Sequence, residues 1–149
     1  MIIGFTGSRH EPTTEQRLWL LECLLDYPPK EFHHGCCIGS DAFAHGAAKS
    51  CSDLGLGCIV LHPPSDPSRE MEYTNWDYAN CTWYPKKDYL VRNKDIVREC
   101  DMLLALPDGP KRPHSGTWTT IGYAEQYGKP VLICDPLGKI KIVDKRGTP

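Results

Sequence analysis

Small and hydroxyl-bearing residues gather immediately before a helical pattern in the last third of the chain. They are Ser115, Gly116, Thr117, Thr119 and Thr120. A helix needs one such residue as its cap, so the surplus indicates that something outside the chain is held here. Successive backbone amides of Ser115, Gly116 and Thr117 can form a nest for an anion, and the helix dipole adds positive potential at the same point. We therefore predict a phosphate-binding site at the start of this helix.

A second glycine-containing turn follows the apolar N-terminal segment, in the stretch "TGSR". Gly7 allows a ligand to approach the backbone closely, Ser8 adds a hydroxyl, and Arg9 carries a guanidinium that can bind an anion. The alternative is a tight turn followed by a solvated arginine.

Two further polar motifs fit the same kind of site. In the stretch Gly39, Ser40 and Asp41, a side chain either caps the next helix or also accepts hydrogen bonds from ribose hydroxyls. Arg92 and Asn93 lie near the start of another helical pattern. Arg92 either reaches the same ligand as the nest or forms a surface salt bridge.

Several familiar sites are missing from the sequence. It contains neither the G-x-x-x-x-G-K-[ST] run of P-loop proteins nor the G-x-G-x-x-G dinucleotide fingerprint. Its eight cysteines include no C-x-x-C pair, and most lie in apolar or helical contexts that favour buried free thiols. The stretch "HHGCC" offers imidazoles and thiols, but adjacent ligands do not easily close one tetrahedron. We expect neither a metal nor a cofactor.

Composition narrows the class of protein. The 149 residues fit one domain, spanning 1–149. The formal net charge of −2 argues against nucleic-acid binding through a basic field. No segment approaches the roughly 20 apolar residues of a membrane span, and no signal-peptide pattern begins the chain. We expect a cytoplasmic protein without a membrane partner.

Apolar strand patterns alternate with helical patterns along the chain. Strands are expected over residues 1–7, 31–37, 58–64, 101–107 and 130–135, helices over 14–27, 40–54, 89–100 and 116–128, and a short edge strand within 138–149. This alternation predicts an α/β, Rossmann-like three-layer sandwich with a mainly parallel sheet of about five strands. The aromatic stretch 73–84 has no clean period, and we expect it either to stack on a base as a lid or to pack on the domain itself.

In such a sheet, ligands bind beyond the carboxyl ends of the strands. Four polar motifs follow expected strands and should therefore share one edge: "TGSRH", "GCCIGSD", "HPPSD" and "PDGPKRPHSGT".

The order of these motifs resembles the SLOG superfamily of Rossmann-like domains, which includes DprA, the LOG phosphoribohydrolases and the small YspA-like proteins. "GSDAFAHGAA" resembles the Gly-x-Asp-x-x-Ala-His segment of DprA, and "SGTWTTIGYAEQYGKPV" resembles its Ser-Gly-Ser/Thr segment. The "RN" step before an apolar strand is most similar to the YspA-like branch. The resemblance covers residues 2–135 and implies a bound nucleotide or nucleotide derivative, with its phosphate on the Gly-Thr nest. Related proteins are often dimers or larger, which implies a homo-oligomer.

The resemblance also exposes a difference from the LOG enzymes. The glutamate that supports N-glycosidic cleavage there falls on Thr120 here, and a threonine brings no charge to the reacting sugar. Candidates for catalysis are therefore Asp41, Arg92 and Glu125.

Three functions stay open at this point. A nucleotide sensor or sequestering protein comes first. A phosphoribohydrolase or a deoxyribosyltransferase-like enzyme is the alternative, and a DprA-like nucleic-acid accessory protein is a weaker one.

Overall fold

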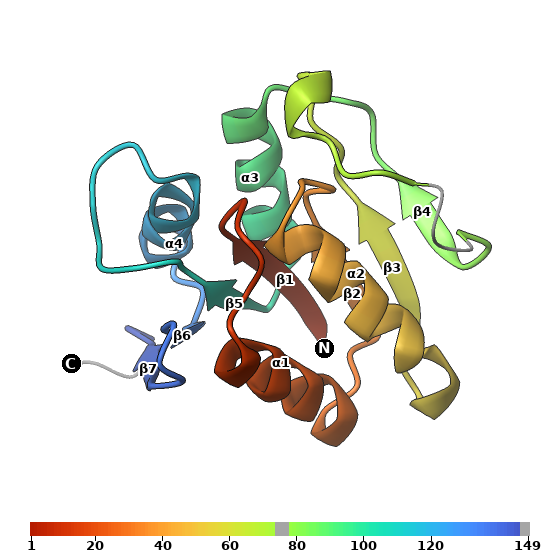
Figure 1. Cartoon of the computed structure of the whole chain (residues 1–149), viewed down its shortest axis with the longest axis horizontal. Helices are drawn as coiled ribbons and strands as arrows, with labels where there is room; N and C mark the ends of the chain where they lie inside the picture. The colour runs from red at the N-terminus through yellow and green to blue at the C-terminus, as the bar shows by residue number, and fades with distance from the viewer. Residues whose placement is uncertain (74–77, 147–149) are drawn as a thin grey trace.

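The chain folds into a central sheet with helices on both faces (Figure 1). The computed structural model describes residues 1–73 and 78–146. The strands are β1 (Ile2–Gly7), β2 (Glu31–His34), β3 (Cys58–Leu61), β4 (Cys81–Trp83), β5 (Met102–Leu106), β6 (Val131–Cys134) and β7 (Ile140–Val143). The α-helices are α1 (Thr14–Asp26), α2 (Ser40–Ser50), α3 (Tyr89–Glu99) and α4 (Gly116–Gln126), with short 3-10 turns at Ser52–Leu54 and Pro67–Arg69.

The strands are ordered β4-β3-β2-β1-β5-β6-β7. Every neighbouring pair is parallel except β6 and β7. The predicted α/β, Rossmann-like three-layer sandwich is confirmed, but the sheet has seven strands instead of about five. The chain builds outward from β1 in one direction through β2, β3 and β4, then returns to the other side of β1 with β5. The junction of β1 and β5 is therefore the topological switch point of the sheet.

The two additional strands lie at the edges, where the sequence signal is weakest. β4 has three residues, of which Thr82 and Trp83 are exposed, so no alternation marks it. It lies inside the stretch 65–87, for which no element was expected. β7 lies within the expected edge segment and exposes both Ile140 and Ile142.

Two apolar clusters flank the sheet. Phe5, Leu20 and Ala44 belong to the cluster beneath α1 and α2, and Ile96 and Ile121 belong to the cluster beneath α3 and α4. Because side chains alternate along a strand, neighbouring residues of β1 face different clusters. This alternation decides which residues of β1 can reach a site next to α3 and α4.

No described helix is long and apolar enough to cross a membrane. The eight cysteines are all free thiols in the structure.

Candidate functional site

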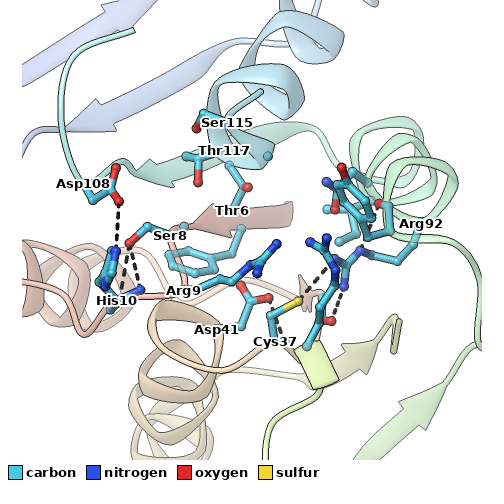
Figure 2. Close-up of a pocket in the computed structure, with 18 of the residues that line it drawn as sticks. Thr6, Ser8, Arg9, His10, Cys37, Asp41, Arg92, Asp108, Ser115 and Thr117 are labelled. Atoms are coloured by element: carbon cyan, nitrogen blue, oxygen red, sulfur yellow. Dashed lines mark hydrogen bonds and ion pairs between the residues drawn. The ribbon is translucent and has the colours of Figure 1, made fainter. Parts of the chain in front are cut away.

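A cavity of about 260 Å³ opens at the switch point, beyond the carboxyl ends of β1, β2 and β5 (Figure 2). Its volume lies near the lower end of the range for small-molecule sites. Nine of the residues predicted to bind a ligand line it, namely Gly7, Ser8, Arg9, Asp41, Arg92, Asn93, Ser115, Gly116 and Thr117. The structure therefore brings together three of the four polar motifs that the sequence placed at one edge of the sheet, whereas no residue of "HPPSD" lines the cavity.

The start of α4 faces this cavity with unused backbone donors. Ser115 is the N-cap, and its side chain accepts a hydrogen bond of 3.3 Å from the Trp118 amide. The amides of Gly116 and Thr117 donate to no acceptor within the described chain. A Cβ atom added to Gly116 would meet nothing within 4 Å. The first turn of α4 thus presents free N–H groups, with the positive end of the helix dipole, to open space.

The residue before the cap has an unusual backbone. His114 has φ of 60°, in the left-handed region, and its side chain is exposed and lines the cavity. The cost of this conformation for a non-glycine residue is of the order of 1–3 kcal/mol. The next residue, Ser115, is extended, with φ of −89° and ψ of 121°, and leads directly into the first turn of α4.

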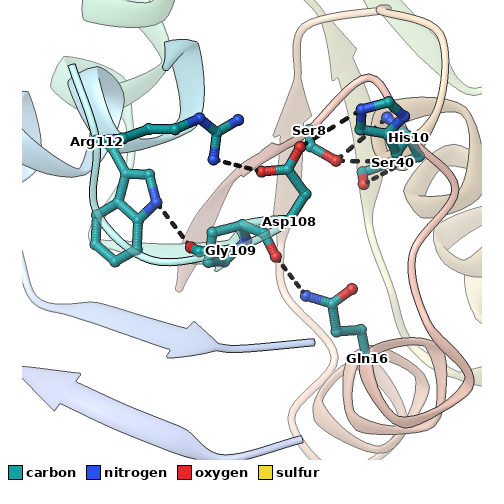
Figure 3. Close-up of polar contacts among 9 residues, drawn as sticks. Ser8, His10, Gln16, Ser40, Asp108, Gly109 and Arg112 are labelled. Carbon is teal, nitrogen blue, oxygen red and sulfur yellow. Dashed lines mark hydrogen bonds and ion pairs between the residues drawn. The ribbon is translucent and has the colours of Figure 1, made fainter. Parts of the chain in front are cut away.

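Buried hydrogen bonds hold the loop between β5 and α4 in place (Figure 3). The Gln16 side chain donates to the carbonyl oxygens of Pro107 and Cys134, at 2.8 and 3.0 Å. The Trp118 indole donates to Gly109 O at 3.1 Å. These contacts tie the loop to α1 and to α4, so the nest is held by buried elements instead of by the loop alone.

The Gly39–Ser40 pair holds the loop that carries Arg9. A Cβ on Gly39, whose φ is +83°, would lie 2.1 Å from Arg9 O, so glycine is required at this close approach. Ser40 N donates to Ser8 O at 3.0 Å, and the Ser40 hydroxyl donates to His10 O at 3.2 Å. Gly39 and Ser40 do not line the cavity. Neither Ser40 nor Asp41 caps α2, because Gly39 occupies the N-cap position and no side chain bonds there.

Arg92 is tied to the protein itself. Its guanidinium donates to the carbonyl oxygens of Gly35 and His62, and to the Cys37 sulfur at 3.3 Å. The residue is 4% exposed and lines the cavity, and these bonds cross-link α3 to the ends of β2 and β3. The surface salt bridge considered from sequence is wrong, because Arg92 is buried.

Asp41 lies in the cavity wall next to the same cluster. Its Oδ2 accepts a hydrogen bond of 3.1 Å from the Cys37 amide. Burial raises the pKa of the Asp41 carboxyl to about 6, and the nearby Arg92 charge opposes that rise. Asp41 is therefore a buried carboxylate that can exchange a proton near physiological pH.

The cavity is electropositive overall. Four arginines line it against two aspartates, the arginines being Arg9, Arg69, Arg92 and Arg112. Asp108 is already paired, with Arg112 at 2.8 Å and His10 at 3.6 Å, and its hydrogen bond from Arg112 lowers the pKa of the Asp108 carboxyl. Arg9 makes no hydrogen bond or ion pair with any described residue, and Figure 2 shows its guanidinium over Asp41.

Besides Gly39 and Ser40, two more of the predicted residues lie away from the cavity. Thr120 is fully buried, and its hydroxyl donates to Gly116 O at 2.8 Å within α4. Glu125 lies more than two turns along α4 and pairs with Lys145 at 3.5 Å. Neither residue lines the cavity, so neither can bring a side chain to a ligand bound there.

Sequence reasoning missed several cavity residues. They include Thr6, His10, Cys37, Arg69, Tyr89, Asp108 and Arg112. Asp108 and Arg112 lie in the polar segment directly after β5, and that position was a usable signal. No sequence signal pointed to Arg69, because it reaches the cavity from the 3-10 turn Pro67–Arg69. Its guanidinium stacks on Tyr89, with 4.3 Å from Cζ to the ring centroid.

The aromatic stretch packs on the domain itself where it is described. Tyr73, Tyr78 and Trp83 contact one another with ring centroids 5.3–5.7 Å apart, and Tyr84 contacts His62 at 4.2 Å. None of these four residues lines the cavity. Residues 74–77 lie outside the described range.

The histidines of "HHGCC" bond to other histidines. His33 Nδ1 lies 2.8 Å from His62 Nε2, and His34 Nε2 lies 2.9 Å from His45 Nδ1. His33 also bonds to Glu31 at 2.9 Å. These nitrogens are used inside the fold, and no group of three or more metal-ligating side chains occurs among the described residues.

Comparison with known proteins supports the architecture. A scan of protein-family models and a search of curated proteins returned no match. Among solved structures, the X-ray structure of TM1055, a structural genomics target, matches with a TM-score of 0.61 and 20% sequence identity. The match covers 87% of this chain and 71% of TM1055. At this identity the likeness concerns the fold alone.

Proposed function

We propose that this protein binds a nucleotide or nucleotide derivative, with a phosphate on the amides of Gly116 and Thr117. The observation that carries the proposal is the meeting of two features in one cavity. Amides at the start of α4 that have no acceptor among the described residues face open space. The electropositive wall of the same cavity includes Arg9, which likewise has no partner in the described part of the chain. A helix N-terminus with an arginine nearby is a common way to bind phosphate.

The sequence resemblance supports a nucleotide over a simple anion. We place the chain in the SLOG superfamily, nearest its small YspA-like branch, on the order of its motifs. Asp41, in the wall of the same cavity, can accept hydrogen bonds from an uncharged polar part of the ligand. A role as a cytoplasmic sensor or as a sequestering protein follows from binding without an evident catalytic glutamate.

The test is calorimetry with AMP, ADP and inorganic phosphate on variants of two glycines in α4. Gly116→Val should abolish binding, because the added side chain fills the open space over the amides. Gly122→Val is a matched control, since a Cβ there also meets nothing within 4 Å but Gly122 does not line the cavity. Unchanged AMP affinity in Gly116→Val, with the fold intact by circular dichroism, would contradict the proposal.

A second candidate is cleavage or transfer at the N-glycosidic bond of a nucleotide. One observation favours it: Asp41 is a buried carboxyl in the cavity wall, with its pKa raised to about 6. A carboxyl of that kind can act as a general acid or base, or can stabilise positive charge on a sugar ring. Loss of base release in Asp41→Asn would identify this activity.

A further inference from the structure

Three polar side chains in the cavity wall have no partner among the residues that the structure describes. Thr6, Asn93 and Thr117 are 8%, 7% and 5% exposed, and all three line the cavity. None of their side chains forms a hydrogen bond with a residue in the ranges 1–73 and 78–146. Their polar atoms still reach the cavity, because none of them is among the sealed, unpaired polar atoms of the interior.

Unpaired groups of this kind are unusual inside a folded protein. Most side chains buried to this extent find a partner in the protein, whereas these three keep their polar atoms open to the cavity. Three such side chains around one cavity therefore point to a ligand that supplies the missing hydrogen bonds.

The fold explains why the three meet. Phe5 of β1 faces the cluster under α1 and α2, so the next residue, Thr6, faces α3 and α4. Asn93 and Ile96 lie one turn apart on α3, and Thr117 belongs to the first turn of α4. Figure 2 shows Thr6 and Thr117 between Ser115 and Arg9. We call the wall formed by Thr6, Asn93, Ile96 and Thr117 the neutral recess.

We propose that the neutral recess binds the pentose of the ligand through its hydroxyl groups and selects ribose over 2-deoxyribose. This inference rests on the proposed phosphate site at α4. The recess contains no charged side chain, so the part of the ligand that it binds is uncharged. Two threonine hydroxyls and one amide each offer both a donor and an acceptor. Each sugar hydroxyl can likewise both donate and accept a hydrogen bond.

The position of Thr117 favours a pentose over a base. Its backbone amide belongs to the phosphate nest and its side chain to the recess, so the recess begins next to the phosphate. In a nucleotide, the group joined directly to the phosphate is the pentose. A flat platform for a base is available at the stack of Arg69 on Tyr89, which also lines the cavity.

The experiment compares AMP with dAMP, and ribose 5-phosphate with 2-deoxyribose 5-phosphate, by calorimetry. The native protein should bind each ribose compound at least about 10-fold more tightly, since the deoxy compound leaves a buried polar group unpaired. In Asn93→Leu this ratio should fall to near one, while the affinity for inorganic phosphate stays unchanged. Thr117→Val should also lower the ratio, and its control Thr119→Val, outside the cavity lining, should leave the ratio unchanged.

A stability measurement separates ligand recognition from a structural role. Asn93→Leu removes an unpaired amide, so its thermal midpoint without ligand should equal or exceed that of the native protein. If that variant does not fold, Thr6→Val provides the same test.

Equal affinities for AMP and dAMP in the native protein would overturn this inference and leave the phosphate site standing. The inference would also be overturned if Asn93→Leu left the ratio of ribose to deoxyribose affinity unchanged. The same holds if that variant changed the preference for the base instead. Failure of all the phosphate compounds to bind would overturn the proposed function itself.

Discussion

The two ends of the cavity use their polar groups in opposite ways. At the α4 end, the amides of Gly116 and Thr117 and the side chain of Asn93 have no partner among the described residues. At the β2 end, Arg92 and the Cys37 amide are hydrogen-bonded within the protein, Cys37 donating to Asp41. Both ends were predicted from sequence as ligand-binding motifs. The difference shows that a polar motif at the correct edge of a sheet can serve a ligand or can hold the elements that surround it.

The largest expected effect concerns the β2 end of the cavity, which we call the paired end because its polar groups bond within the protein; the α4 end is the unpaired end. Arg92→Met should lower the free energy of unfolding by about 3 kcal/mol or more, because buried carbonyls lose a charged donor and Asp41 loses its compensating charge. Urea denaturation measures this change.

Arg9→Met is the matched variant at the exposed arginine. It should leave the free energy of unfolding nearly unchanged but weaken AMP binding by about 1.5–3 kcal/mol. If Arg92→Met were as stable as the native protein and lost affinity alone, Arg92 would belong with the ligand-binding end.

The next prediction concerns chemistry at the unpaired end. The protein should release base from AMP at least about 100-fold more slowly than enzymes with a preorganised glutamate at the position of Thr120. The Thr120 hydroxyl bonds to Gly116 O inside α4 and brings no charge to a sugar. Chromatography of AMP incubations measures the release of adenine.

Two variants locate any activity that is found. Asp41→Asn would abolish turnover if the paired end supplied the carboxylate. Glu125→Gln is the control, because Glu125 lies outside the cavity and pairs with Lys145. Rapid multiple turnover that depends on Asp41 would make the enzyme the leading function.

The last prediction is a pH dependence of stability at the β2 end of the cavity. Burial lowers the pKa of His45 to about 4 and of His62 to about 3, and lowers that of His34 well below its usual value. Unfolded histidines titrate near pH 6.5, so below that pH the unfolded chain binds protons that the folded chain excludes. The free energy of unfolding should therefore fall as the pH drops from about 6.5 to 4.

The titration of Asp41 has the opposite effect on the free energy of unfolding. Its folded pKa of about 6 exceeds its unfolded value, so protonation between about pH 6 and 4 favours the folded state. Urea denaturation at several pH values should show a steeper loss in Asp41→Asn than in the native protein. A flat profile of Asp41→Asn between pH 6.5 and 4.5 would show that the buried histidines titrate normally.

Much of the fold followed from the sequence. Alternating apolar and helical patterns placed β1, β2, β3, β5, β6 and the four helices, since burial on both faces of a parallel sheet leaves continuous apolar strands. β4 was missed because a short, exposed edge strand buries too little to leave a pattern. The site was located for a similar reason: polar residues that directly follow buried strands must meet at the carboxyl edge.

The sequence by itself determined the fold class, the edge of the sheet at which the polar motifs gather, and the glycine and hydroxyl residues at the start of α4. The tertiary structure decided the role of each residue in these motifs. It paired Arg92 with the backbone carbonyls of Gly35 and His62, used Gly39 and Ser40 to hold the Arg9 loop, and placed Glu125 outside the cavity. It also brought Thr6, Asn93 and Thr117 together from three separate elements. The physical reason is that motifs and periodicity are local properties of the chain, whereas hydrogen bonding in a buried site depends on residues far apart in sequence.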